Sequence, residues 1–541
     1  MHALLLAAAL TLAASPAMIG DLNDAPRDAG TASSLRDRRH NQALEWDPWI
    51  AAVGARAFFE AAAADGQVRL WVSDGTPSGT APLAAIDAQL PFVAGERLFF
   101  QVRPDGRHNG IWQSDGSAAG TAVVEFPKVP DTTPDPLGVV GSRLLFANSY
   151  GGAGREPWIT DGSAAGTMQL ADINPLAGSS PDDAVSLPGR AVFTANSELG
   201  RELWATDGTA GGTALVADLT PGPGSTFQLG GAQLLRVGDA VLFPARGALW
   251  RSDGTTAGTA SLTPLPAARL AAAMVAGGRL VFQPAVTPPV LWASDGTAAG
   301  SEPIAAGIRL SRAIGAVGRL SLFLAVDGDG EALWASDGTA TGTRRLRALR
   351  SDPTRAFTAA CLAAECLFAA DDGAHGVEAW RSDGSAAGTA LVADLLPGAA
   401  GSHAYGFAIA GARAVFLADD GTHGIELWQS DGTAARRLAD LAPGATSSAL
   451  GLRDEVRPLL VTATHVLLGA DDGVHGREPW AMAIAAPGDC GADGVVSVDE
   501  LVRIVGIALG LEPLTRCAAA DANGDGAVSI DEITTAIAAA L

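Results

Sequence analysis

The sequence has no long apolar run and few charged residues. No stretch reaches the ~18–20 consecutive apolar residues of a membrane-spanning helix, which excludes a multi-span membrane protein. Only 18% of the 541 residues are charged, and 36 basic residues face 59 acidic ones, for a net charge of −23. This field repels phosphate backbones and anionic lipid. We therefore expect no nucleic-acid partner, whereas metal cations are natural ligands.

Familiar catalytic signatures are also absent. The sequence contains no G-x-S-x-G elbow, no H-E-x-x-H helix and no P-loop, so we assign no catalytic residues. A mean hydropathy of +0.21 with 12 tryptophans excludes a disordered chain. At about 150 residues per domain, the length predicts three or four domains or one large repeat array.

The N-terminus has the pattern of an export signal. Residues 3–14 are apolar, and Ser15 and Ala17 put small residues at the −3 and −1 positions of a cleavage site. We predict a signal peptide over residues 1–17 and a secreted or cell-surface protein; a buried helix or a misassigned start is the alternative. Export would place the four cysteines where disulfides form. Their simplest pairing is Cys361–Cys366 and Cys490–Cys517, with buried free thiols as the alternative.

A tryptophan-centred motif recurs along most of the chain, as in LWATDGTAGGT from Leu203 and LWQSDGTAARR from Leu427. Copies about 40 to 50 residues apart, built from short strands, are typical of propeller blades. One repeat divides into four strands joined by Gly and Asp-Gly turns. We expect each tryptophan to pack between blades; a stacking platform for sugars is the alternative. The repeat tryptophans are Trp71, Trp112, Trp158, Trp204, Trp250, Trp292, Trp334, Trp380, Trp428 and Trp480.

The two ends of the repeat region complement each other. The copy around Trp480 lacks the aspartate turn and the strand after it, and residues 18–23 resemble that missing strand. Because an open array leaves sheet edges unpaired, we predict that residues 18–23 close the ring. The predicted fold is an all-β propeller of about ten four-stranded blades over residues 18–486. Two five-bladed rings are the alternative.

The repeat also carries a family resemblance. The strings Glu202-Leu203-Trp204 with Thr206-Asp207-Gly208-Thr209, and Glu426-Leu427-Trp428 with Ser430-Asp431-Gly432-Thr433, resemble the bacterial ELWxxDGTxxGT repeat proteins. This resemblance covers most of the chain. It implies an extracellular repeat protein and carries over no catalytic residues.

Residues 487–541 have a different character and contain two related acidic loops. The second, DANGDGAVSIDE, matches a calcium-binding EF-hand loop, with a backbone carbonyl at Ala527. The first lacks a side-chain oxygen at Gly491, so we expect weaker binding there, with Val495 as the carbonyl donor. The predicted Ca²⁺ ligands are Asp521, Asn523, Asp525, Ala527, Ser529 and Glu532, and in the first loop Asp489, Asp493, Val495, Ser497 and Glu500.

Each loop is followed by an apolar-striped helix, and the first loop has no obvious helix before it. The strings VSVDEL (496–501) and VSIDEI (528–533) show an internal duplication. This arrangement resembles type I dockerin modules and implies a cohesin-like protein partner. Glu at position 12 and Gly491 depart from the dockerin pattern. The first stripe is predicted to include Leu501, Ile504, Val505, Ala508 and Leu509.

Two further patterns recur in the blades. Asp371-Asp372-Gly373 with His375 and Glu378 returns near His423 and His475; we interpret it as a strand connection, and a metal or ligand site is the alternative. The Arg-Glu pairs at Arg155, Arg201 and Arg477 are expected to form exposed or inter-blade ion pairs.

These patterns favour a secreted, non-enzymatic binding or scaffold protein with a calcium-dependent tail for attachment. Its expected partners are a cohesin-like protein or a cell-surface glycan. The alternative is an extracellular carbohydrate-active enzyme docked through the same tail, which would need two carboxyl groups about 5–9.5 Å apart in one cleft.

Overall fold

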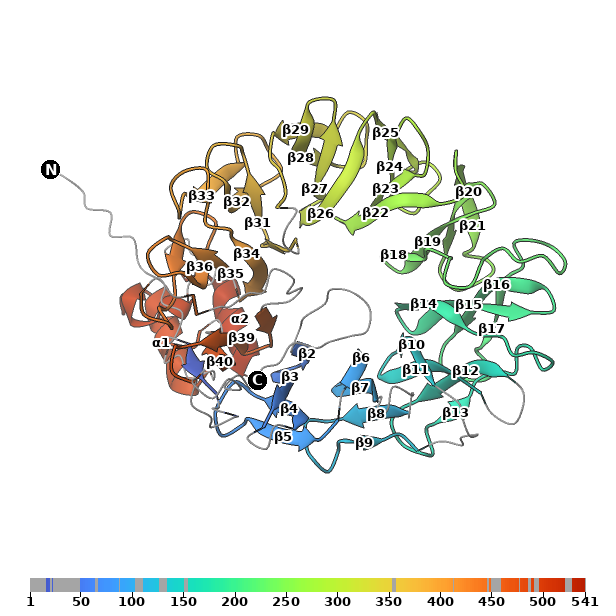
Figure 1. The fold of residues 1–541 in the computed structure, drawn as a ribbon, viewed down its shortest axis with the longest axis horizontal. Helices are drawn as coiled ribbons and strands as arrows, with labels where there is room; N and C mark the ends of the chain where they lie inside the picture. Colours follow the sequence, from blue (N-terminus) through green and yellow to red (C-terminus); the bar gives the residue numbers. More distant parts are fainter. Residues whose placement is uncertain are drawn as a thin grey trace.

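A computed structural model of the chain contains a closed ring of β-sheets and a small helical tail (Figure 1). It describes residues 16–19, 22, 49–63, 67–86, 88–102, 110–125, 134–149, 154–352, 357–411, 413–444, 447–448, 459–475, 477–484, 488–490, 496–520 and 528–540. These residues form ten four-stranded antiparallel sheets, each one blade of a propeller. The predicted all-β fold and blade count are confirmed, and the alternative of two five-bladed rings is wrong.

Each of the first nine blades takes its four strands in chain order, from the centre of the ring to its rim (Figure 1). The first five blades are β2–β5 (Trp49–Val53, Arg56–Ala62, Val68–Ser73, Ala81–Ala84), β6–β9 (Ala88–Ala94, Arg97–Val102, Ile111–Ser114, Ala122–Val123), β10–β13 (Asp135–Val140, Arg143–Ser149, Arg155–Thr160, Met168–Gln169), β14–β17 (Asp182–Leu187, Arg190–Ser197, Gly200–Thr206, Ala214–Ala217) and β18–β21 (Leu235–Val237, Ala240–Ala245, Ala248–Ser252, Ala260–Pro264).

The next four blades follow the same order. They are β22–β25 (Leu270–Ala276, Arg279–Pro284, Val290–Ser294, Glu302–Ala306), β26–β29 (Arg309–Val317, Leu320–Asp327, Gly330–Ser336, Arg344–Arg347), β30–β33 (Ala359–Cys361, Cys366–Asp371, Val377–Ser382, Ala390–Ala393) and β34–β37 (Tyr405–Ala410, Arg413–Asp419, Ile425–Ser430, Ala435–Arg437).

The tenth blade combines the two ends of the ring. Its inner strands are β38 (Leu459–Val461), β39 (His465–Asp471) and β40 (Arg477–Ala483), and its outer strand is β1 (Ala17–Met18). Met18 pairs with Trp480, and the Ile19 amide donates to the Pro479 carbonyl at 3.0 Å. Closure by the N-terminal segment is therefore confirmed. The strand begins one residue earlier than predicted and is two residues long.

Apolar side chains fill the layers between neighbouring blades. Ten buried clusters each join two adjacent blades, and each contains or contacts one repeat tryptophan, as predicted. In the layer between the fourth and fifth blades, Leu203 and Phe243 are fully buried beside Trp250. Burying one such side chain stabilises the fold by roughly 1.5–3 kcal/mol. Because each layer needs two blades, no blade buries its apolar faces alone.

A buried or half-buried carboxylate or amide side chain fastens every blade to the chain segment that leads into the next one. Glu378 accepts hydrogen bonds from the Leu396 amide at 3.1 Å and from the Ser402 amide and hydroxyl at 2.8 and 2.5 Å. At the closing junction Glu478 accepts from the Leu22 amide at 3.1 Å. We call these side chains the junction latches: Glu60, Gln101, Glu156, Glu202, Gln233, Gln283, Glu331, Glu378, Glu426 and Glu478.

The latches correct the expectation of exposed Arg-Glu ion pairs. Glu156, Glu202 and Glu478 are buried and accept hydrogen bonds from backbone amides of the crossing segments. Arg201 is itself buried and donates to the Thr194 hydroxyl and the Ser180 carbonyl. A buried amide without a partner is costly, so the crossing segments require an acceptor here.

The Ser/Thr-Asp-Gly-Thr turns hold the third and fourth strands of a blade together. In the fourth blade, Asp207 Oδ1 accepts from the Thr209 amide at 2.8 Å and its hydroxyl at 2.7 Å. A Cβ added at Gly212 would lie 2.1 Å from the same oxygen, so this position requires glycine. The side-chain-to-backbone hydrogen bonds hold the turns in place, so these aspartates have a structural role.

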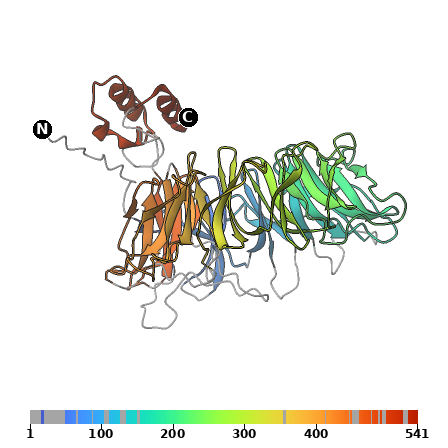
Figure 2. The same ribbon diagram turned by 90° about the horizontal axis from the view of Figure 1, so that it is seen from above.

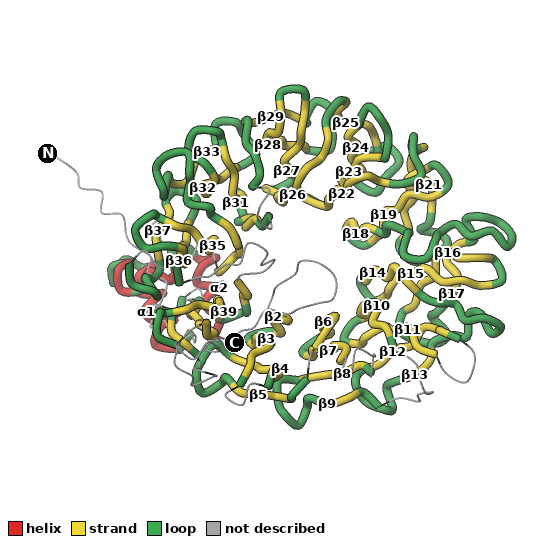
Figure 3. The backbone as a smooth tube through the Cα atoms, in the orientation of Figure 1, coloured by secondary structure: helices red, strands yellow, loops and turns green. Residues whose placement is uncertain are grey.

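The two faces of the ring differ. We call the face with the aspartate turns the turn face and the opposite one the crossover face. Strand β40 ends and β1 begins at the turn face, and the helical tail stands on that side (Figure 2). The helices are α1 (Val498–Ala508) and α2 (Ile530–Ala540), with short 3₁₀ turns at Leu514–Arg516 and Ala518–Ala520 (Figure 3). Among the described residues, no helix is long and apolar enough to cross a membrane.

Both expected disulfides are formed. Cys361–Cys366 links the two strands of the β30–β31 hairpin, and Cys490–Cys517 ties the tail's first loop to the segment before its second. The described residues contain no free cysteine.

Ring closure predicts a strong effect at Ile19, which is 1% exposed in the layer between the tenth and first blades. Replacing Ile19 by Ala should lower the free energy of unfolding by about 2–5 kcal/mol, because it leaves a cavity in that layer. Chemical denaturation measures it. Met168→Ala, at a 44% exposed position of β13, serves as the control, and equal losses would contradict a closing role for Ile19.

The latches predict that Gln is tolerated where Ala is not. Glu378→Ala leaves buried amides unpaired and should cost about 1–3 kcal/mol, whereas Glu378→Gln keeps an acceptor, as Gln233 and Gln283 do at their own junctions. Thermal melting of both variants tests this.

The latches also predict a pH dependence of that stability. Burial raises the pKa of Glu202, Glu378 and Glu426, so their contribution is fully present below the unfolded value near 4.5 and is lost as pH rises through the folded value. Melting temperature should therefore increase on acidification from pH 7 towards 5, and less so in E202Q/E378Q/E426Q. An identical pH profile in this triple variant would disprove the assignment.

Candidate functional site

The described part of the predicted calcium module has buried acidic side chains at the expected positions. Asp489, Glu500 and Glu532 are buried. Glu500 Oε2 accepts from the Ser497 amide at 2.7 Å and its hydroxyl at 2.9 Å, and Ser497 caps α1. A carboxylate is costly to bury unless it is hydrogen-bonded, paired or bound to a metal. The two bonds from Ser497 meet this requirement for Glu500.

The second half of the tail repeats this geometry. Glu532 Oε2 accepts from the Ser529 amide at 2.8 Å and its hydroxyl at 2.9 Å. The internal duplication seen in the sequence thus extends to side-chain contacts at the start of both helices. The two capping boxes fix where each loop ends and each helix begins.

The remaining predicted ligands lie outside the described residues: Asp493, Val495, Asp521, Asn523, Asp525 and Ala527. Within the described residues, no three His, Cys, Asp or Glu side chains form a group that would hold a metal ion. The calcium ligand sets therefore stay predictions.

The tail has a small core and an exposed apolar helix face. Its core consists of Ile504, Ile507, Ala520 and Ala536 around the Cys490–Cys517 bridge. Only part of the predicted apolar stripe of α1 is buried: Ile504 lies in the core, whereas Leu509 is 68% exposed. Spacings of three and four residues put one set of exposed side chains on a single face. We call it the α1 face: Val498, Val502, Val505 and Leu509.

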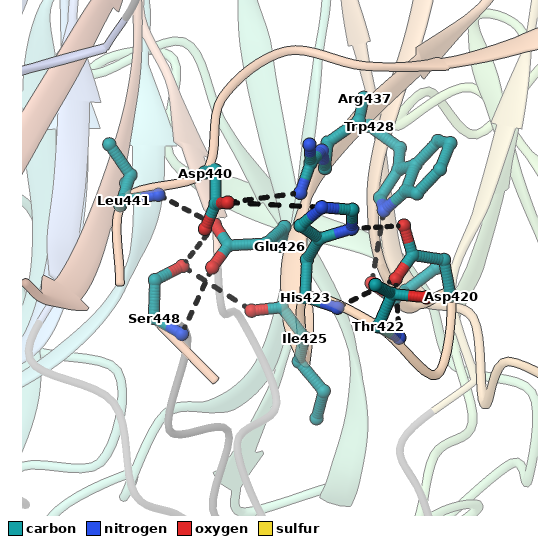
Figure 4. Close-up of polar contacts among 11 residues, drawn as sticks. Asp420, Thr422, His423, Ile425, Glu426, Trp428, Arg437, Asp440, Leu441 and Ser448 are labelled. Carbon is teal, nitrogen blue, oxygen red and sulfur yellow. Dashed lines mark hydrogen bonds and ion pairs between the residues drawn. The ribbon is translucent and has the colours of Figure 1, made fainter. Parts of the chain in front are cut away.

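The Asp-Asp-Gly-x-His pattern forms a compact polar cluster on the crossover face (Figure 4). In the ninth blade, His423 Nδ1 lies 2.7 Å from Asp420 Oδ2, and Asp420 Oδ1 accepts from the His423 amide at 2.8 Å. Asp440 lies on the other side of the His423 imidazole, 3.9 Å from its Nε2 atom and 3.5 Å from Arg437 Nη1. The cluster thus joins the loop between the second and third strands to the segment after the fourth.

The same contact recurs in neighbouring blades, and this decides its interpretation. His375 Nδ1 lies 3.0 Å from Asp372, and His475 Nδ1 lies 2.7 Å from Asp472. Each histidine contacts the aspartate of its own loop, and the three do not converge on one point. The expectation of a strand connection closed by histidine is confirmed.

The buried carboxyl groups do not form a catalytic pair. Glu202, Glu378 and Glu426 have the raised pKa that a catalytic acid needs. Their oxygens, however, are occupied by backbone amides, and in Figure 4 Glu426 binds Ser448 and Leu441. Each serves a different junction, so no two of them share a cleft.

Comparison with known proteins adds no family. No family model matches the chain, and no curated protein sequence matches it. Solved structures with some likeness include a puromycin hydrolase (14% identity, TM-score 0.30, 71% of this chain and 58% of that one) and the designed protein Ika8 (13%, 0.32, 84% and 100%). A structure from a study of two prolyl endopeptidases is 14% identical to this chain, with a TM-score of 0.36 over 72% of this chain and 54% of that one. This chain therefore spans little more than half of those two enzymes, and no function is transferred from them.

Proposed function

We propose that the chain is a secreted, non-enzymatic binding protein of the ELWxxDGTxxGT repeat type, whose ring displays loops and whose tail attaches it to a protein partner. The observation that carries this is the contrast between the two parts. The ring uses its buried glutamates to join blades and its loop histidines to hold the loops of single blades. The tail exposes an apolar helix face beside two acidic loops.

Calcium is the cation that we propose for the tail. Asp489, Ser497 and Glu500 of the first loop, and Ser529 and Glu532 of the second, supply oxygen donors of the kind that Ca²⁺ prefers. The bound ion would join each loop to its helix and add stability to a domain with little core. Disulfides and the apolar N-terminal segment support export.

Calcium removal should unfold the tail and leave the ring intact. Calorimetry is expected to show two transitions, with only the tail transition moving to lower temperature in chelator, because metal binding stabilises the folded state. Calorimetric Ca²⁺ titration should show loss of the tighter site in Glu532→Gln and of the weaker site in Glu500→Gln. Asp499→Asn, at an exposed neighbouring position, is the control, and one transition unaffected by chelator would contradict the proposal.

The α1 face supports attachment through a protein partner. Val498, Val502 and Leu509 are 75, 67 and 68% exposed, and an apolar patch of this kind marks an interaction site. The net charge of −23 disfavours an anionic membrane surface. Ile530 of α2, at the position that matches Val498, is 80% exposed, so the duplicated helix repeats part of this face.

Titration with purified type I cohesin domains in calcium tests this attachment. Val502→Asp and Leu509→Asp should each weaken binding at least tenfold, because a charge on the α1 face would have to lose its water. Val474→Asp, at a 63% exposed valine of the ring, should leave it unchanged. Binding that is absent, or equally lowered by all three changes, would disprove a cohesin-like partner for this face.

A further inference from the structure

A cavity of about 590 Å³ opens on the turn face between the second and third blades. Its wall comes from the turn between the first two strands of each blade and from the aspartate turn of the third. This volume lies within the usual range for small-molecule sites. The polar lining residues are Glu96, Arg97, Gln113, Ser142, Asp161 and Ser163.

The cavity lies where one arginine departs from the pattern of the ring. In two other blades the arginine that opens the second strand donates directly to the next blade's turn. Arg56 donates to the Asp115 carbonyl, and Arg143 donates to the Gly208 carbonyl at 2.7 Å. Here Arg97 Nη1 instead donates to Gln113 Oε1 at 2.7 Å, and Gln113 Nε2 donates to the Gly162 carbonyl at 2.8 Å. Gln113 thus makes the bridge, and Arg97 is held at the cavity wall with further N–H donors unused among the described residues.

The wall also offers acceptors. Glu96 is exposed, and its carboxylate accepts no hydrogen bond from the part of the chain that the structure describes. Asp161 uses Oδ1 for the Ser163 amide and hydroxyl at 2.8 and 2.7 Å. These bonds from Ser163 hold the pKa of Asp161 below its usual value, so it is an ionised acceptor near neutral pH. The cavity therefore combines two carboxylates with one guanidinium.

We propose that this cavity binds a neutral saccharide, whose hydroxyl groups donate to Glu96 and Asp161 and accept from Arg97. The two carboxylates disfavour an anion, Arg97 disfavours a cation, and a hydroxyl group both donates and accepts. Hydrolysis is not implied, since a glycosidase needs one carboxyl group kept protonated. The inference rests on the proposed role of the ring as a binding domain and is independent of the tail.

The same junction also contains two buried polar side chains. Asn148 is fully buried in β11, and among the described residues neither atom of its amide has a hydrogen-bond partner, nor has Gln101 Oε1 in β7. Other blades place Ala195, Ala370 or Ala418 where the third has Asn148. Such groups cost roughly 1–3 kcal/mol each. They lie near the crossover-face ends of β7 and β11, whereas the cavity opens at the turn-face ends of the same strands.

The test uses the full-length protein and a set of neutral disaccharides: cellobiose, xylobiose, mannobiose and lactose. Saturation-transfer NMR should detect at least one of them bound, both in calcium and in chelator. Asp161→Asn should weaken that binding at least tenfold. Asp207→Asn is the matched control, because it removes the same charge from the equivalent turn of a blade whose aspartate is not among the residues of this cavity.

Absence of binding to all four sugars would overturn the proposal, as would equal losses in the two aspartate variants. Binding that disappears in chelator would place the sugar on the tail and would also overturn it. Calcium titration of the tail is a separate measurement, so its failure and the failure of this site are distinguishable.

Discussion

The fold depends on satisfying the backbone of the segments that cross from one blade to the next. These segments lie against buried surface, and water does not reach all of their amide groups. At every junction one side chain hydrogen-bonds to the backbone of the crossing segment; it is a Glu carboxylate at seven junctions and a Gln side-chain amide at three. The apolar layers supply most of the stabilisation. The latches determine which segment lies against which blade, because an amide left unpaired there costs more than a misplaced methyl group.

The division of labour between ring and tail follows from this use of acidic residues. In the ring, Glu202, Glu378 and Glu426 are buried and bind backbone amides, so their carboxyl oxygens are already occupied. The turn aspartates are committed in the same way through Oδ1. Departures from the repeat, such as Gln113 beside Arg97, are therefore the places where the ring has groups to spare for a ligand.

Much of the ring follows from its sequence, because the repeat carries its own register. The tryptophan positions predict the blade count, and the residues around Met18 predict the closing strand. The role of the glutamate before Leu-Trp was missed, because its partners are amides about 20 residues further on and a neighbouring arginine suggested an ion pair. The cavity was also beyond prediction, since Glu96 and Asp161 meet only when two blades pack side by side. In the tail, motif spacing predicts the ligands, and the described capping contacts agree with the helix starts.

The position of the chain break within the tenth blade has a consequence for folding. The partner of Met18 is separated from it by more than 450 residues, so the first strand made must wait for the last blade before it can pair. Contacts between residues this far apart in the sequence form late, because closing the long intervening loop costs conformational entropy before the contact stabilises the chain. Until then the outer edge of the tenth blade at β40 is unpaired and one apolar face of the first blade is uncovered. A chain released early would have an incomplete ring open to pairing with other molecules.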